Sequence, residues 1–135
     1  MILNTFPSLL TFSQISPLML RVVLGLITIN LGYLKLTKEK TAWQKLFETI
    51  NIQPAKIFVK VLACIEILGA LMLLAGAYTQ ITAMVFALLF FCEAILEYRE
   101  SDLEKRNLTF YILMFTISLS LIFLGAGAFA LDLPL

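Results

Sequence analysis

The sequence predicts an all-α integral membrane protein, folded as an antiparallel four-helix bundle with a short amphipathic helix at the membrane surface. Two observations predict this class. Of the 135 residues, 61% are hydrophobic and only 14% are charged, whereas soluble domains have roughly 45–50% and about 25%. Four long apolar segments also follow one another, each long enough to cross a hydrocarbon core of about 30 Å. We therefore expect one membrane domain, residues 1–135, surrounded by the lipid bilayer, and not a soluble enzyme.

The apolar segments give the four predicted spans, at about residues 17–36, 57–77, 79–98 and 107–128. Pro17 suits the first turn of the first helix, where its missing N–H is not needed. Only Tyr78 separates the second span from the third, so we expect these two spans to form a tight antiparallel hairpin.

The connection between the first two spans contains the predicted surface helix, at about residues 41–50. Its large apolar side chains recur at helical spacing and therefore share one face; they are Trp43, Leu46, Phe47 and Ile50. A Trp on such a face suits the headgroup boundary. We expect this helix to act as a surface anchor. The connection between the third and fourth spans mixes both signs of charge and is predicted to be a solvated turn.

The basic residues predict the threading of the chain. Nine of the ten lie in or beside the connections between spans one and two and between spans three and four: Lys35, Lys38, Lys40, Lys45, Lys56, Lys60, Arg99, Lys105 and Arg106. Only Arg21 lies on the other side. Cytoplasmic loops carry an excess of Lys and Arg, so we expect both termini outside the cytoplasm. The net charge of +1 gives no basic surface for nucleic acid.

The chain has no His, the commonest metal ligand and general base. Cys64 and Cys92 form no Cys-x-x-Cys pair, and we expect both thiols to be buried and to behave as small apolar groups. We predict no metal site, and the catalytic residues, if the protein has any, stay unknown.

Polar residues inside the spans are the candidate site, because an ionisable group near the bilayer centre costs about 2.5–3.5 kcal/mol. At about 1.5 Å per residue, Asn30, Glu66 and Glu93 share a level near the midplane. With no Lys or His opposite them, at least one of the two acids is expected to stay protonated. Alternatively, both acids only hydrogen-bond to Asn30, Thr116 or Ser118 and specify helix pairing. Lys35 and Lys60, near the cytoplasmic ends, are expected to snorkel.

Arg21 lies on the outer side and is expected to need a partner. Asp132, in the tail beyond the fourth span, emerges on the same side, and we predict an Arg21–Asp132 pair that extends to Glu66. The intramembrane polar network is thus predicted to contain Arg21, Asn30, Glu66, Glu93 and Asp132. Glycines seven residues apart share a helix face and allow close packing in lipid; the predicted packing residues are Gly25, Gly32, Gly69 and Gly76.

The order of these residues resembles the DoxX family. The first span has an Arg, a Gly and then Gly-x-x-Lys, which are Arg21, Gly25, Gly32 and Lys35. The second span has Glu-x-x-Gly and a later Gly, which are Glu66, Gly69 and Gly76. The C-terminal stretch has Gly-x-Gly and an Asp, which are Gly125, Gly127 and Asp132. The resemblance covers about Pro17 to Asp132. Many members have Gly-Pro-Gly and Ser-Leu-Asp where this chain has Gly-Ala-Gly and Ala-Leu-Asp, so the resemblance carries over least to the tail.

The resemblance implies a small protein of the prokaryotic inner membrane, related to the membrane subunits of thiosulfate to quinone oxidoreductase. It implies a non-catalytic subunit associated with a sulfur- or quinone-linked redox partner protein. No cofactor is predicted from the residues. Only the family relationship suggests a quinone, which would bind near Arg21 or Glu66. Phe86, Phe90 and Phe91 would line that site. A small proton-linked transporter using Glu66 and Glu93 and a structural membrane scaffold are the alternatives. A homo-oligomer also stays open.

Overall fold

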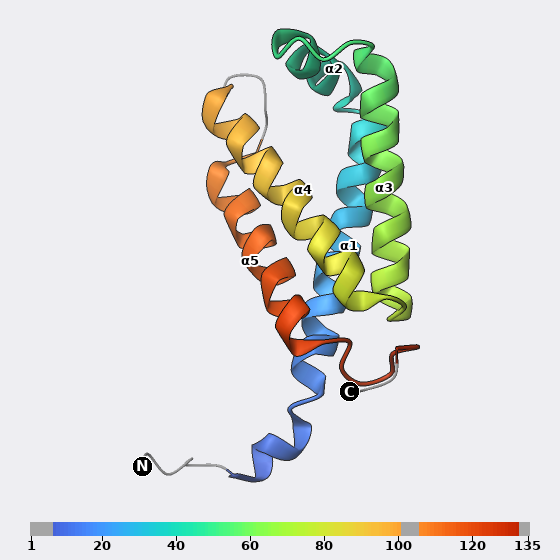
Figure 1. The fold of residues 1–135 in the computed structure, drawn as a ribbon, viewed down its shortest axis with the longest axis vertical. Coiled ribbons are helices and arrows are strands. Elements are labelled where there is room, and N and C mark those ends of the chain that lie inside the picture. The colour runs from blue at the N-terminus through green and yellow to red at the C-terminus, as the bar shows by residue number, and fades with distance from the viewer. Residues whose placement is uncertain (1–6, 101–105, 133–135) are drawn as a thin grey trace.

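The computed structural model describes residues 7–100 and 106–132, and the chain is all-helical within these two ranges. A short 3₁₀ helix, η1 (Pro7–Phe12), comes first. Five α-helices follow: α1 (Ile15–Leu36), α2 (Lys40–Thr49), α3 (Ala55–Ala75), α4 (Thr79–Arg99) and α5 (Leu108–Leu124) (Figure 1). All five were predicted from the sequence, with helix ends that differ by four residues or fewer.

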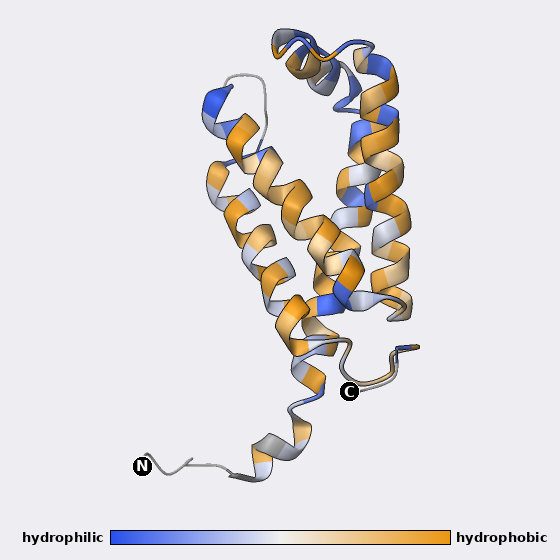
Figure 2. Ribbon diagram, in the orientation of Figure 1, coloured by the Kyte–Doolittle hydropathy of each residue, from blue (hydrophilic) through white to orange (hydrophobic). Residues whose placement is uncertain are grey.

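Three of the helices, α1, α3 and α4, are long and apolar enough to cross a membrane. Their outward-facing side chains are apolar too, for example Leu26, Leu68 and Leu88, each more than half exposed. Figure 2 shows this hydrophobic character along the helices and polar residues gathered at α2 and the neighbouring helix ends. Such a surface is unfavourable in water and favourable in lipid, so the chain is a membrane protein.

The fourth predicted span is shorter than expected. Helix α5 has 17 residues and ends at Leu124, whereas the apolar pattern continues to residue 128. The reason is local: Gly125 has a φ of 75°, which an α-helix does not contain. Residues 125–132 instead form a non-helical tail, which crosses the end of the molecule opposite α2 (Figure 1).

The long helices pack in two pairs, α1 with α3 and α4 with α5, and the pairs meet through α1–α5 and α3–α4 contacts. Buried apolar residues fill the space between the pairs, including Leu24, Leu31, Leu73, Phe86 and Phe90. Gly32 permits the close approach of α1 to α3, because a Cβ there would lie 2.7 Å from Ile67 Cγ1 and 3.0 Å from the Ala63 carbonyl oxygen.

The turn between α3 and α4 is as tight as the sequence predicts. Gly76 ends α3 in the left-handed conformation, with a φ of 70°. Its N–H donates to the Leu73 carbonyl, and the Ala77 N–H donates to the Met72 carbonyl. This pair of bonds is a Schellman motif, which satisfies the last carbonyls of the helix. A glycine is needed here because residues with a Cβ rarely adopt this conformation.

Helix α2 has a protein partner for its apolar face. Trp43, Leu46 and Phe47 are buried and pack against Ala55 and Val59 of α3. The predicted helix is therefore present, but its apolar side chains fill a second small core and do not face the headgroups. Its place at a membrane surface stays a prediction.

Candidate functional site

Three ionisable side chains meet where α1, α3 and α4 come together, and we call them the buried ion cluster. Lys35 is in the last turn of α1, Glu66 in the middle of α3 and Glu93 in the second half of α4. Their exposed fractions are 1%, 0% and 2%. The Lys35 ammonium donates hydrogen bonds to Oε1 of Glu66 and to Oε1 of Glu93. One cation thus links acids from two other helices.

The expectation that Lys35 snorkels to the membrane surface is therefore wrong, as is the expectation that no lysine lies opposite the two acids. The reason is the position of α2, which covers the end of α1. The Lys35 Nζ atom lies 4.2 Å from the centroid of the Trp43 ring, so an aromatic side chain closes the way out. Lys60, by contrast, is exposed, as an anchor would be.

The cluster has one cation for two acids. The carboxyl groups of Glu66 and Glu93 also lie close enough to interact with each other. Among the residues that the structure describes, the second oxygen of each, Oε2, is buried and has no hydrogen-bond partner. A buried carboxylate oxygen without a partner is costly. With all three groups ionised, the cluster therefore carries one uncompensated negative charge.

More charged groups lie between the cluster and the loop end of the bundle. Glu97 is one turn beyond Glu93 on α4 and is buried. Glu39, at the start of α2, accepts a 2.7 Å salt bridge from Arg106, just before α5. Burial lowers the pKa of Arg106, but the Glu39 carboxylate and the Tyr111 hydroxyl outweigh burial and hold this pKa above its usual value.

This salt bridge changes the interpretation of the connection between α4 and α5, which was predicted to be a solvated turn. Arg106, at its end, is half-buried and ties α5 to the start of α2. Residues 101–105, with the predicted loop cation Lys105, lie outside the described part of the chain.

At the opposite end of the molecule, Arg21 holds the tail. Its Nη1 atom donates to the Ala126 carbonyl at 2.8 Å, and its Nη2 atom donates to the Ala128 and Phe129 carbonyls at 3.3 and 3.2 Å. Arg21 is 1% exposed. The tail is not helical, so these carbonyls have no intrahelical donors, and the guanidinium supplies them.

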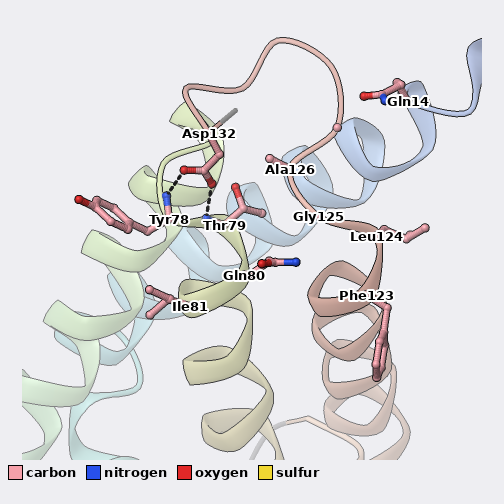
Figure 3. Close-up of a pocket in the computed structure, with 11 residues that line it drawn as sticks. Gln14, Tyr78, Thr79, Gln80, Ile81, Phe123, Leu124, Gly125, Ala126 and Asp132 are labelled. Carbon is pink, nitrogen blue, oxygen red and sulfur yellow. Dashed lines mark hydrogen bonds between the residues drawn. The ribbon is translucent and has the colours of Figure 1, made fainter. Parts of the chain in front are cut away.

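Asp132 binds the N-terminus of α4 and not Arg21. Its carboxylate accepts the backbone N–H groups of Tyr78 at 2.8 Å and Thr79 at 2.6 Å (Figure 3). These bonds, Thr79 first, hold the pKa of Asp132 below its usual value, and the Arg21 charge adds a smaller effect. The predicted direct pair is wrong because free N–H groups at a helix start attract a carboxylate. The predicted extension to Glu66 is also wrong, since Glu66 binds Lys35.

The tail also borders a pocket that no sequence pattern predicts. Its volume is about 440 Å³, and its polar lining includes Gln14, Thr79, Gln80 and Asp132 (Figure 3). A second, almost wholly apolar pocket of about 390 Å³ lies between α4 and α5, where Phe91 faces Phe115 with ring centroids 5.6 Å apart.

Three of the polar residues named from the sequence lie away from the cluster or bond elsewhere. Asn30 is exposed on α1. Thr116 donates to the Ile112 carbonyl and Ser118 to the Met114 carbonyl, both within α5. The alternative in which Glu66 and Glu93 bond to these three residues is therefore wrong. Cys64 and Cys92 are unpaired and exposed, so the expectation that they are buried is wrong as well.

The predicted packing glycines lie between elements. Gly25 and Gly32 face α3, where a Cβ on each would meet Leu74 and Ile67. Gly69 faces the Phe86 ring of α4, and Gly76 lies against Arg21 and Ala130 of the tail. Of the aromatic residues named as walls, Phe86 and Phe90 fill the core and only Phe91 is exposed.

Comparison with known proteins adds the family. The family model described as DoxX matches residues 16–96, which include all three members of the buried ion cluster. A search of curated proteins and a search of solved structures found no match. More than half of the chain fits the family model, and the chain belongs to the DoxX family.

Proposed function

We propose that this protein is a non-catalytic membrane subunit that associates with a sulfur- or quinone-linked redox enzyme of a prokaryotic inner membrane. The observation that carries the proposal is the DoxX match over residues 16–96. These residues form the helices that hold Lys35, Glu66 and Glu93 together. The role itself comes from the family resemblance, and the structure supports it with a lipid-facing helical body to which a partner could bind.

In this proposal the chain is one domain that crosses the membrane four times as an antiparallel bundle. Helix α5, at about 1.5 Å per residue, is about 26 Å long, at the short end of the range for a transmembrane helix. Helix α2 lies at the end where the basic residues gather, so this end faces the cytoplasm and α2 lies near its headgroups. Both termini then lie on the outer side.

The buried ion cluster serves this subunit by fixing how α1, α3 and α4 pack. An apolar helix interface in lipid is weakly directional, because lipid tails are as apolar as the side chains. A lysine that must reach two acids at once permits few arrangements. The apolar pocket between α4 and α5, with Phe91 and Phe115, is then the place where a quinone ring of the complex could rest.

Purification of a tagged chain from its native membrane in mild detergent tests the proposal. We expect a soluble redox enzyme to co-purify in a fixed stoichiometry, and the complex to reduce quinone only when that partner is present. The matched variants are Lys35→Met, which disrupts the cluster and should lose the partner, and Lys60→Met, which should keep it. Robust quinone reduction by the purified chain alone would refute the non-catalytic role. Size measurement of the same sample tests whether the chain forms a homo-oligomer.

One observation favours a second candidate, a small proton-linked transporter that uses Glu66 and Glu93. Their buried Oε2 atoms have no partner among the described residues, and the cluster has one more acid than bases. Proton-coupled flux into liposomes that is lost in Glu66→Gln would support this candidate. If the chain shows neither a redox partner nor flux, the structural scaffold is the remaining interpretation.

A further inference from the structure

We propose that the buried ion cluster holds one exchangeable proton, shared by Glu66 and Glu93, which enters from the loop end of the bundle by way of Glu97. The inference goes beyond the subunit role and does not depend on it. For the transport alternative, it would identify the proton site and the side from which that site is filled.

The charge count of the cluster is the first argument. Two acids and one lysine, each 2% exposed or less, leave one negative charge if all are ionised. An uncompensated charge in a low-dielectric interior is strongly unfavourable, and the group neutralises instead. The Oε2 atoms of both acids, which have no hydrogen-bond partner within the described part of the chain, give the proton a place on either acid. One proton makes the cluster neutral and lets one carboxyl donate a hydrogen bond to the other.

The neighbouring charged groups do not supply the missing positive charge. Facing this end of the bundle are Glu39 at the start of α2, Glu97 on α4, Arg106 just before α5 and Tyr111 in the first turn of α5. Arg106 is the only cation among these four, and Glu39 balances it through the 2.7 Å bridge. Glu97 adds a further acid. Among the described groups at this end, none supplies a cation to Glu66 or Glu93 beyond Lys35, so a proton can neutralise the cluster.

The position of Glu97 indicates the entry side. Glu93 and Glu97 are four residues apart on α4, so they share a helix face and are separated by about 6 Å along the axis. Glu97 is buried but lies only two residues before Arg99, the last residue of the helix. It thus stands between the cluster and the loop end.

The opposite direction is closed by apolar side chains. Leu31, Phe86 and Phe90 lie between the cluster and the Arg21 end, and each is 2% exposed or less. Thr28 and Ser118, at similar levels, donate to carbonyls of their own helices. In residues 7–100 and 106–132, a proton has no chain of titratable groups to follow on this side.

The proposed step is a proton relay without redox chemistry. A hydronium ion at the loop end transfers a proton to the Glu97 carboxylate: one O–H bond of the hydronium breaks, a new O–H bond forms on Glu97, and a water molecule is released. The Glu97 O–H bond then breaks as a new O–H bond forms on the carboxylate of Glu93 or Glu66, and Glu97 returns to its ionised form. No electrons are gained or lost, and the return step runs in reverse.

Infrared spectroscopy of the purified protein in lipid vesicles at neutral pH tests the proton count. The carbonyl stretch of a protonated carboxyl is distinct from the carboxylate bands, so it counts bound protons. We expect one buried protonated carboxyl in the wild type, none in Glu66→Gln or Glu93→Gln, and two in Lys35→Met. No protonated carboxyl in the wild type, or an unchanged count in both glutamine variants, would overturn the proposal. The wild-type measurement decides even if a variant fails to fold.

The exchange rate of the same band in D₂O tests the entry route. Glu97→Gln should slow the exchange about 100-fold, which is the low end of what a positioned proton-transfer group contributes. Glu97→Asp, which keeps a titrating group, should restore most of the rate. Glu100→Gln, just beyond the end of α4, is the matched control and should match the wild type. Equal rates in Glu97→Gln and the wild type would overturn the route. If the protonated carboxyl band is present but the protein carries no proton flux in liposomes, the proposed proton site stands and the transport alternative is excluded.

Discussion

Replacing Lys35 with Met should destabilise the protein far more than the same change at Lys60. Both lysines were expected from the sequence to be surface anchors, but Lys35 is 1% exposed and holds two buried acids, whereas Lys60 is exposed. Removing one partner of a buried ion pair costs about 3–5 kcal/mol. An exposed substitution costs within about 0.5 kcal/mol.

The size of the effect should depend on pH. Without Lys35, the folded protein must bind protons on both Glu66 and Glu93, while the unfolded chain keeps these acids ionised well above a pKa of about 4.3. The folded state then binds more protons than the unfolded state, so its stability rises as the pH falls. The penalty for Lys35→Met should therefore be largest near pH 8 and shrink toward pH 5.

Thermal unfolding in detergent at several pH values is the assay. At a few degrees per kcal/mol, the variant should unfold on the order of 10 °C below the wild type at pH 8. Lys60→Met should unfold within about 2 °C of the wild type at every pH. If Lys35→Met and Lys60→Met lost the same stability, or if the Lys35→Met penalty grew as the pH fell, the buried ion cluster as described would be wrong.

Three further predictions concern the tail and the helix packing. The pKa of the Asp132 carboxylate is held low in the folded protein, so this group stabilises the fold at pH values above its unfolded pKa of about 3.9. The stabilisation is lost as the pH falls through the folded pKa. The difference in Tm between the wild type and Asp132→Asn should therefore vanish in acid. Gly32→Val should cost about 1–3 kcal/mol in chemical unfolding because it forces α1 from α3, while Asn30→Val, on the exposed face, should cost little. Arg21→Met should leave three tail carbonyls without their donor and make the tail sensitive to protease, and Arg99→Met should not; an unchanged digestion pattern for Arg21→Met would contradict the tail contacts.

The helices could be predicted because their signals are local. A run of apolar residues and a proline at residue 17 act within a few residues of themselves, and the observed helices follow them closely. The one clear error in length, at the end of α5, has a local cause as well. Gly125 interrupts a run that remains apolar, and hydropathy alone does not register a positive φ.

The partners of the charged residues could not be predicted in the same way. The depth of Glu66 and Glu93 along their helices follows from counting residues, but the lysine that binds them comes from the end of α1. Whether a lysine at a helix end reaches water or turns inward depends on what covers that end. Trp43 of α2 covers the end of α1 here. The sequence pattern does not predict how α1 and α2 lie relative to each other.

The sequence by itself determined that the chain is helical, that its surface suits lipid, which family it belongs to and which ionisable residues lie inside the spans. Only the tertiary structure decided that Lys35 joins Glu66 and Glu93, and that Arg21 and Asp132 bind the backbone instead of each other. The physical reason is the distance over which each kind of interaction acts. Helix formation and hydropathy sum over neighbouring residues, whereas ion pairing requires atoms from different helices to meet within a few ångströms, and packing alone fixes which of them do.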